Sequence, residues 1–131
     1  MNKTPSITVS IKTLNEAQGI EKTIDSVRKQ LQPYPHQIIV ADSLSTDNTR
    51  ELAIAKGAMV VCLDNAADRC CGIGHQLGWL YSEGDYLLLL DGDMELEPGF
   101  LDTAVEFLET HPEYAGVAGS VEMDDASNYE F

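Results

Sequence analysis

Two aspartates one residue apart, Asp91 and Asp93, are the residues of this sequence with the clearest capacity for chemistry. They follow the apolar run Tyr86–Leu90, which is typical of a strand buried on both faces of an α/β sheet. Ligands of open α/β sheets bind outside the carboxyl ends of the strands. Two carboxylates at that edge are costly unless a positive charge joins them, and a hard divalent cation takes oxygen ligands and bridges to phosphates. The pair therefore predicts a divalent-cation site.

Three further polar segments follow predicted strands, at Lys12–Glu16, Asp42–Asp47 and Asp64–His75. Because the loops after parallel strands lie on one side of a sheet, these segments can converge with the two aspartates. A nucleotide at this edge needs polar partners for its base and ribose, and a cation for its phosphates. Asp42 or Ser43 is the candidate partner of a base. Asp91 is the candidate partner of a ribose, and Asp93 with a metal would hold a diphosphate.

The elements that would position these residues alternate between strand and helix. β-Branched and apolar runs predict strands at residues 6–11, 37–41 and 58–63, from 85 onward, and at 115–121. Helical spacing of apolar residues predicts helices at 16–32, 48–56, 72–82 and 98–110. Such alternation predicts a three-layer α/β/α fold with a mostly parallel sheet, in a single domain over residues 1–131.

Particular residues are expected to fix these helices. Asn15 is the predicted N-cap of the helix over residues 16–32, and Asp47 is predicted to cap the next helix. In the helix over residues 72–82, Leu77, Trp79 and Leu80 are expected to pack against the sheet. The first strand is followed by neither a Gly-x-Gly-x-x-Gly nor a Walker-type Gly-Lys-Ser/Thr sequence, so dinucleotide-binding and NTPase functions are not favoured.

The composition excludes several classes of function. The 131 residues include 8 Lys and Arg and 22 Asp and Glu, and the net charge of −14 argues against nucleic acid or an anionic membrane as partner. No apolar stretch approaches about 18 residues, so no transmembrane segment is predicted. An odd number of cysteines, with Cys70 and Cys71 adjacent, fits reduced thiols better than a disulfide framework and predicts a cytoplasmic protein.

Four segments resemble, in order and spacing, the motifs of family 2 glycosyltransferases of the GT-A fold. They are Lys12-Thr13-Leu14-Asn15-Glu16 after the first strand, Ala41–Asp47 after the second, Gly74–Gly78 at a helix start, and Gly84–Asp93, which contains an Asp-x-Asp (DXD) motif. The resemblance covers nearly the whole chain. It implies a Rossmann-like GT-A fold that binds a nucleotide-diphospho-sugar.

The resemblance implies a UDP- or GDP-linked sugar donor and a Mn²⁺ or Mg²⁺ cofactor. Transfer would be a hexosyltransferase-type direct displacement, with inversion at the anomeric carbon, onto an unknown acceptor. Carried over by position, the residues of the nucleotide-sugar site are Thr13, Leu14, Glu16, Asp42, Ser43, His75 and Asp91. Asp42 would approach the base, and Asp91 would contact the ribose or a metal-bound water. Asp93 would be the direct metal ligand, with Asp91 beside it.

The sequence departs from the family pattern at four positions. Leu14 stands where the family has a tyrosine, so an aromatic platform for the base is missing. Ser43 replaces a second aspartate, which weakens any carboxylate contact with the base. Lys12 replaces a proline and could offer positive charge. His75 replaces an arginine or lysine near the phosphates and is expected to be uncharged near neutral pH.

The chain is also shorter than most members of the family, whose second half carries the acceptor site and the catalytic base. The sequence therefore predicts a truncated or minimal donor-binding portion, with no catalytic residue assigned. Glu122, Asp124 and Asp125 follow the last predicted strand and match no base motif. The alternative is a non-catalytic nucleotide-sugar-binding or assembly module, in which an unmatched apolar seam would favour a homo-oligomer. A nucleotidyltransferase is a third possibility, but the first loop lacks a glycine-rich, basic character.

The candidate residues also have purely structural interpretations. Asp91 and Asp93 could end a strand and cap the next turn, and Asp42 could be an ordinary turn residue. Glu16 could be a first-turn acid favoured by the helix dipole, and His75 could be a surface residue of its helix. Placement in the fold decides between these interpretations and a shared site.

Overall fold

The computed structural model describes residues 3–123, which fall into two compact units, one ending at Pro98 and the other beginning at Gly99. The single domain expected over residues 1–131 stays a prediction. Asp124 and Asp125, named above as candidate acids, lie outside the described residues.

The first unit alternates strands and helices along the chain. Its elements are β1 (Ile7–Thr13), α1 (Ile20–Leu31), β2 (His36–Asp42), α2 (Thr49–Ala55), β3 (Met59–Cys62), the 3₁₀ turn η1 (Ala66–Asp68), α3 (Ile73–Leu80) and β4 (Tyr86–Asp91). The second unit contains α4 (Phe100–Thr110). The first four predicted strands and the predicted helices are therefore confirmed in type and order. None of the helices within residues 3–123 is long and apolar enough to cross a membrane.

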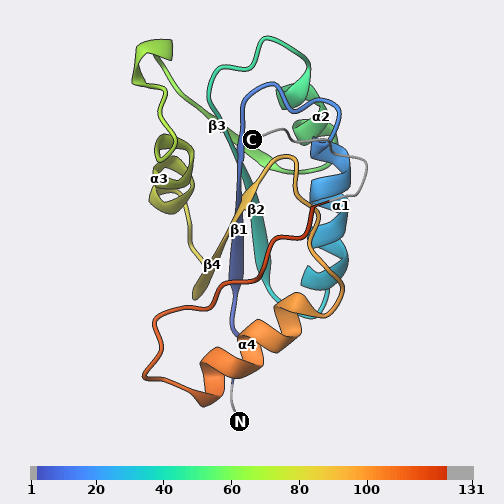
Figure 1. Ribbon diagram of the computed structural model, residues 1–131, viewed down its shortest axis with the longest axis vertical. Coiled ribbons are helices and arrows are strands. Elements are labelled where there is room, and N and C mark those ends of the chain that lie inside the picture. Colours follow the sequence, from blue (N-terminus) through green and yellow to red (C-terminus); the bar gives the residue numbers. More distant parts are fainter. Residues whose placement is uncertain (1–2, 124–131) are drawn as a thin grey trace. The chain divides into compact units, whose positions relative to one another are not determined.

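The four strands form one parallel sheet in the order β3-β2-β1-β4. Helices α1 and α2 lie on one face of this sheet and α3 lies on the other, so the predicted three-layer α/β/α fold is confirmed (Figure 1). The chain winds from β1 through β2 to β3 and then returns to the other side of β1 with β4. The carboxyl ends of β1 and β4 therefore flank a topological switch point, where open α/β sheets bind ligands.

The register of the sheet brings several predicted site residues to one edge. Thr13 of β1 is paired with Asp42 of β2, and Lys12 is paired with Asp91 of β4. Side chains at paired positions of a sheet point to the same face, and successive residues point to opposite faces. Lys12 and Asp91 therefore share one face of the sheet edge, and Thr13 and Asp42 share the other.

The core of the first unit follows from strand alternation in β1 and helical spacing in α1. Ile7, Val9 and Ile11 of β1 are at most 1% exposed. The buried residues of α1 recur at helical spacing and are Ile20, Thr23, Ile24, Val27 and Leu31. Burial of one Val, Leu or Ile side chain contributes about 1.5–3 kcal/mol relative to exposure, so this layer is a main source of stability beneath the sheet edge.

Helix α3 approaches the sheet closely because two glycines face β1. A Cβ placed on Gly74 would lie 2.6 Å from Cβ of Lys12, and a Cβ placed on Gly78 would lie 1.7 Å from Oγ of Ser10. A side chain at either position would push the helix away from the strand. The glycines thus set the first turn of α3 directly beside Lys12.

The bulky residues at the end of α3 are not the ones that pack on the sheet. Trp79 and Leu80 are 63% and 58% exposed, so the prediction that they pack against the sheet is wrong. Residues four apart lie on one face of a helix, and Gly74 and Gly78 occupy the face toward β1. The adjacent Trp79 and Leu80 are consequently turned away from the strand.

The prediction that Asn15 caps a helix is also wrong. Helix α1 begins at Ile20, its N-cap position is Gly19, and no side chain caps it. Asn15 instead adopts a left-handed φ of 56° and binds the loop after β2. A turn closed by hydrogen bonds from Gly19 and Ile20 to the carbonyl of Glu16 separates β1 from α1.

The predicted strand over residues 115–121 is not formed. Residues 111–123, which follow α4 in the described part of the second unit, form no helix or strand. Val117 and Val121 are 41% and 69% exposed. Gly116 and Gly119 interrupt the segment, and glycine weakens a strand because it offers no side chain to pack.

Replacement of Gly78 by alanine is expected to lower the free energy of unfolding by about 2–3 kcal/mol, because the new methyl group overlaps Oγ of Ser10. Gly116→Ala is the control, because a Cβ there meets nothing within 4 Å; its effect should stay below about 0.5 kcal/mol. Urea denaturation followed by circular dichroism measures both. Equal midpoints for the two variants would contradict the packing of α3 on β1 through its glycines.

Candidate functional site

Asp42 is buried at the end of β2, and neighbouring groups occupy both of its carboxylate oxygens. Its exposed fraction is 0%. Oδ1 accepts hydrogen bonds from Oγ1 of Thr13 at 2.7 Å and from Oγ of Ser45 at 2.5 Å. Oδ2 accepts one from the backbone N–H of Ser45 at 2.8 Å and lies 3.7 Å from Nε of Arg50. This carboxylate joins the ends of β1 and β2 to the loop after β2.

The loops after β1 and β2 interlock through the side chain and backbone of Asn15. Its Oδ1 accepts hydrogen bonds from the N–H groups of Thr46 and Asp47 at 2.8 and 3.3 Å. Its own N–H donates to Oγ of Ser45 at 2.9 Å. Leu14, held between this interlock and the end of β1, remains 43% exposed.

Asp47 supports the start of α2 and the turn before α1. Its Oδ1 accepts hydrogen bonds from the N–H and the hydroxyl of Thr49, and its Oδ2 accepts one from the N–H of Ala17 at 3.2 Å. The bond from the Thr49 hydroxyl is the largest cause that holds the pKa of Asp47 below its usual value. Asn48 occupies the N-cap position itself. Asp47, one residue before it, accepts the hydrogen bond from the N–H of Thr49 at the start of the helix.

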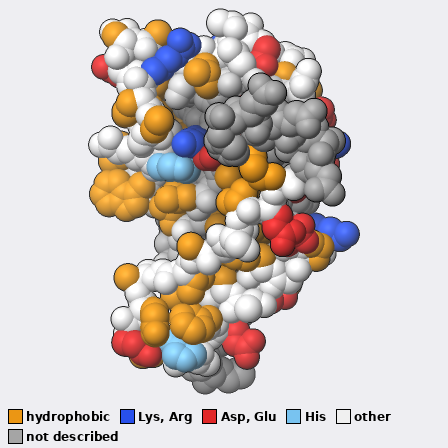
Figure 2. Space-filling view, in the orientation of Figure 1, with side chains coloured by type: hydrophobic (Ala, Val, Ile, Leu, Met, Phe, Trp, Pro, Cys, Tyr) orange, Lys and Arg blue, Asp and Glu red, His pale blue; other side chains and the backbone are white. Residues whose placement is uncertain are grey.

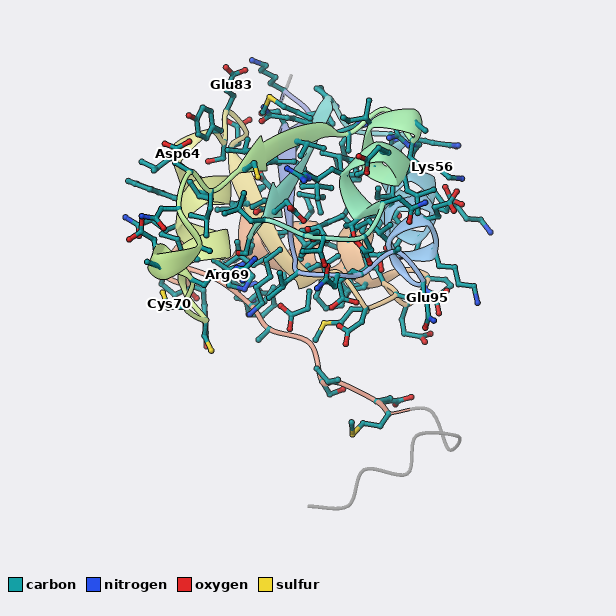
Figure 3. All side chains as sticks on the ribbon, turned by 90° about the horizontal axis from the view of Figure 1, so that it is seen from above. Lys56, Asp64, Arg69, Cys70, Glu83 and Glu95 are labelled. Atoms are coloured by element: carbon teal, nitrogen blue, oxygen red, sulfur yellow. The ribbon has the colours of Figure 1, made fainter. Side chains whose placement is uncertain are left out.

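Arg69 ties the loop before α3 to the loop after β2. Its Nε donates to the carbonyl of Ser43 at 2.7 Å, and its Nη2 donates to the carbonyl of Leu44 at 2.8 Å. Leu44 has a left-handed φ of 64°, which is uncommon for a residue other than glycine. In the view along the sheet, Arg69 and Cys70 lie on the side of the molecule opposite Lys56 (Figure 3).

Gly92 docks the loop after β4 against β1 and α1. Its N–H donates to the carbonyl of Lys12 at 2.9 Å, and its carbonyl accepts a hydrogen bond from Oγ1 of Thr23 at 3.0 Å. A Cβ on Gly92 would lie 2.8 Å from Cγ2 of Thr13 and 3.0 Å from Cγ of Glu16. The absence of a side chain therefore lets the two aspartates that flank this glycine sit against the loop after β1.

Asp91 belongs to a small ion-pair cluster at the switch point. Its Oδ1 lies 3.4 Å from Nζ of Lys12 and 3.8 Å from Nε2 of His75. Nζ of Lys12 also donates to the carbonyl of Cys71 at 3.4 Å. Figure 2 shows a histidine, a basic and an acidic side chain gathered at one place on the face in view, in agreement with these contacts.

His75 is expected to be neutral near pH 7 in this cluster. Burial is the largest cause that lowers the pKa of its ring, Lys12 lowers it further, and Asp91 opposes both. Its Nδ1 is buried and has no hydrogen-bond partner within residues 3–123. This environment agrees with the sequence-based expectation of an uncharged ring.

Glu16 lies where negative charge accumulates at the sheet edge. Its pKa is raised above the usual value of 4.5, first by burial and then by the charges of Asp93, Asp47 and Asp91, in that order. Asp93 makes the largest of these charge contributions and is itself exposed. A cation beside Glu16 and Asp93 would relieve this repulsion.

The donors at this edge suit a hard divalent cation. Within residues 3–123, no group of three or more His, Cys, Asp and Glu side chains is close enough to hold a metal ion without further ligands. Ions such as Mg²⁺ are usually bound by one or two carboxylates together with the phosphates of a substrate. The carboxylates of Asp93 and Asp91, with the field of Glu16, fit that mode of binding.

The structure brings some predicted site residues together and leaves others apart. The residues at the β1–β4 switch point are Glu16, His75, Asp91 and Asp93. The residues at the neighbouring β1–β2 ends are Thr13, Leu14, Asp42 and Ser43. The N–H of Ser43 donates to the carbonyl of Thr13 at 2.9 Å, which joins these two strand ends. The approach of Asp42 to a base stays a prediction. Both oxygens of Asp42 already accept hydrogen bonds, so a contact with a base would replace one of them.

The sequence analysis did not identify the residues that fix the loops. Arg69 and Arg50 donate hydrogen bonds to backbone carbonyls. A pattern of residue types does not predict such bonds. Ser45 was part of a recognised motif, but its bonds to Asp42 depend on the turn after β2. The role of Gly92 could have been predicted, since a glycine between two acids at a strand end indicates a close approach of the backbone to a neighbouring segment.

Comparison with known proteins decides the family. The sequence matches the profile described as Glycosyl transferase family 2 over residues 8–130. The chain belongs to glycosyl transferase family 2. Among relatives of this family 2 chain, the low-salt glycan biosynthesis hexosyltransferase Agl6 of Haloferax volcanii is 36% identical over 95 residues, which are 68% of this chain and 21% of the relative. Glucosyl-3-phosphoglycerate synthase of Mycobacterium tuberculosis is also 36% identical over 95 residues, covering 68% of this chain and 29% of that protein.

Solved structures agree with the family assignment. The M. tuberculosis glucosyl-3-phosphoglycerate synthase in complex with Mn²⁺, UDP and glucosyl-3-phosphoglycerate is 32% identical, with a TM-score of 0.67 over 79% of this chain and 39% of that chain. The S. aureus TarS fragment 1–349 is 23% identical, with a TM-score of 0.72 over 82% of this chain and 33% of that chain, a likeness that shows the fold alone. The predicted GT-A fold is confirmed.

The family 2 chain spans less than half of the length of each of these relatives, from 21% to 39%. The activity, substrates and partners of the complete relatives are therefore only proposed for this chain.

Replacement of Asp42 by alanine is expected to lower the free energy of unfolding by about 2–4 kcal/mol, because two hydroxyls and a buried N–H lose their acceptor. Asp25→Ala is the control: Asp25 is 57% exposed and pairs with Lys56 at the surface, so its loss should cost less than about 1 kcal/mol. Denaturant unfolding compares the two. Similar losses would show that the Asp42 network is not a main tie between the strands.

Replacement of Glu16 by glutamine is expected to stabilise the protein at pH 7 in the absence of divalent cations, by less than about 1 kcal/mol because the group is largely solvent-screened. A carboxyl whose folded-state pKa is raised loses stability as pH rises through and above 4.5, so the gain from glutamine should vanish below about pH 4. Thermal melting of both proteins from pH 3 to pH 8 in EDTA measures the difference. A constant offset across that range would contradict the electrostatic cause.

Proposed function

We propose that this family 2 chain is the donor-binding portion of a metal-dependent, inverting glycosyltransferase that uses a nucleotide-diphospho-sugar. The observation that supports this most directly is the convergence of Glu16, Asp91 and Asp93 at the switch point, beside the interlocked loops after β1 and β2. A relative 32% identical has been solved with Mn²⁺ and UDP, which supports the same ligand classes here.

The loops after β1 and β2 are the proposed site of the nucleoside. Leu14 offers exposed apolar surface there, and the backbone of Ser43 is held in place by Thr13 and Arg69. In this proposal Asp42 acts mainly by fixing these loops. It would meet a base only by exchanging one of its present hydrogen-bond partners.

The diphosphate is proposed to lie beside Asp91 and Asp93, with His75 close to it. Asp93 is the proposed direct ligand of Mn²⁺ or Mg²⁺, and Asp91 contacts the ion, its water or the ribose. When bound, such an ion supplies Lewis-acid stabilisation of the charge on the leaving diphosphate. Glu16 adds to the local negative potential that attracts a cation, while the chain's net charge of −14 would otherwise repel a diphosphate.

The proposed reaction is displacement at the anomeric carbon. The oxygen of an acceptor hydroxyl forms the new glycosidic bond while the bond to the diphosphate oxygen breaks, and the configuration inverts. The hydroxyl proton needs a base, and no described residue is assigned that role. The cytoplasmic location and a homo-oligomeric state stay predictions.

Asp93→Asn is expected to weaken the Mn²⁺-dependent binding of UDP at least about tenfold, because loss of a direct ligand should cost no less than loss of an outer-shell partner. Asp25→Asn is the control: it removes the same charge from an exposed side chain of α1 that pairs with Lys56 and belongs to none of the loops at the sheet edge. Isothermal titration calorimetry with UDP and GDP, with and without Mn²⁺, measures the affinities. Unchanged metal dependence in Asp93→Asn would refute the ligand assignment.

A turnover assay separates transfer from binding alone. Release of UDP or GDP from a nucleotide sugar, measured with water as the acceptor, would support a catalytic chain. Tight, metal-dependent nucleotide binding without detectable release would favour the donor-binding module. Failure of the folded chain to bind either nucleotide in the presence of Mn²⁺ would contradict both.

A further inference from the structure

We propose that Lys12 exchanges partners during donor binding. It pairs with the carboxylate of Asp91 when no donor is bound, and it pairs with the diphosphate once a divalent cation has taken Asp91. This inference rests on the proposed function, and it adds a specificity-determining residue that the metal-ligand and nucleotide assignments do not contain.

Lys12 stands at the position where an exchange would take place. It is the β1 residue paired with Asp91 in the sheet register, so both side chains project from neighbouring strands to the same face of the switch point. Its Nζ lies between Oδ1 of Asp91 and the carbonyl of Cys71, 3.4 Å from each. The ammonium is therefore already beside the place proposed for the diphosphate.

The present contacts of Lys12 are loose. Hydrogen bonds from nitrogen to oxygen usually span about 2.7–3.2 Å, and both contacts of Nζ are longer. Lys56 gives a measure within the same protein, because its side chain is equally exposed, at 32%, yet its Nζ lies 3.0 and 3.1 Å from the oxygens of Asp25. The Lys12–Asp91 pair is thus the longer of two comparable surface pairs and is the easier one to break.

The ammonium end of Lys12 can move because its side chain is 32% exposed. Gly74 packs closely against the base of the stem, where an alanine would place a carbon 2.6 Å from Cβ of Lys12. The outer part of the flexible four-carbon stem can redirect its ammonium without a change in the backbone. The Lys12 backbone itself is fixed, because its carbonyl accepts the N–H of Gly92 at 2.9 Å.

Charge balance favours the exchange in one direction. A cation on Asp91 repels the ammonium of Lys12, and a diphosphate attracts it. Two cationic groups, the divalent ion and the ammonium of Lys12, then face the diphosphate instead of one. Lys12 therefore disfavours the metal alone and favours the metal together with a phosphorylated donor, which couples the two ligands.

The test is Lys12→Met, which keeps much of the stem and removes the charge. Mn²⁺ is titrated without nucleotide by calorimetry, and UDP, or GDP where UDP does not bind, is then titrated at saturating Mn²⁺. The variant should bind Mn²⁺ alone about twofold to fivefold more tightly, because a competing cation is gone. It should bind the nucleoside diphosphate about tenfold more weakly, because a charge-assisted contact is lost.

Two further variants and one melting curve complete the test. Lys12→Arg should restore most of the nucleotide affinity, and Lys56→Met, equal in charge and lysine exposure, should leave both affinities within about twofold of the wild type. Thermal melting confirms that each variant is folded. A merely structural role for Lys12 predicts that both affinities fall together, and that result, or no change in either, overturns the proposal. Wild-type protein that binds no nucleoside diphosphate with Mn²⁺ overturns the proposed function itself.

Discussion

Carboxylates converge on one edge of the sheet, and the way each is compensated governs the rest of the site. Asp42 is satisfied inside the protein by hydroxyl and N–H donors, with Arg50 nearby. Asp91 forms an ion pair with a partly exposed lysine, Lys12. The pKa of Glu16 is raised, first by burial and then by its negative neighbours Asp93, Asp47 and Asp91. Compensation of the carboxylates therefore weakens from the end of β2 toward the β1–β4 switch point, so the switch point is the part of this edge that attracts a cation most strongly.

Glycines make this convergence sterically possible. Gly92 lets the loop after β4 meet the loop after β1, where any side chain would collide with Thr13 and Glu16. Gly74 and Gly78 do the same for α3 on the opposite face of β1. The carboxylates are thus held close by backbone packing and hydrogen bonds that act whether or not a cation is present. The raised pKa of Glu16, caused first by burial and then by the neighbouring carboxylates, is a consequence of this packing.

The layout of the fold could be predicted because it depends on regularities that a sequence carries directly. Alternating strand and helix patterns dictate parallel strands, and parallel strands bring their carboxyl ends to one edge. Side-chain partners could not be predicted in the same way. The amide of Asn15 is as well suited to a loop as to a helix end, and only the turn before α1 decides for the loop. Trp79 was expected to pack on the sheet, but the glycines of α3 pack there instead. The predicted strand over residues 115–121 failed because Gly116 and Gly119 offer no side chain to pack, which the β-branched residues of the segment do not offset.

This balance of charges explains why a lysine at position 12 is compatible with the site. With the proline typical of the family, Asp91 would add to the uncompensated charge around Glu16, and the edge would be more repulsive before any ligand arrived. Lys12 reduces that repulsion through a long, partly exposed contact that costs little to break. A lysine that held Asp91 as tightly as Lys56 holds Asp25 would block the carboxylate from a metal. A loosely held lysine can instead stabilise the free protein and leave Asp91 accessible, which reconciles the departure from the family pattern with the retained pair of aspartates.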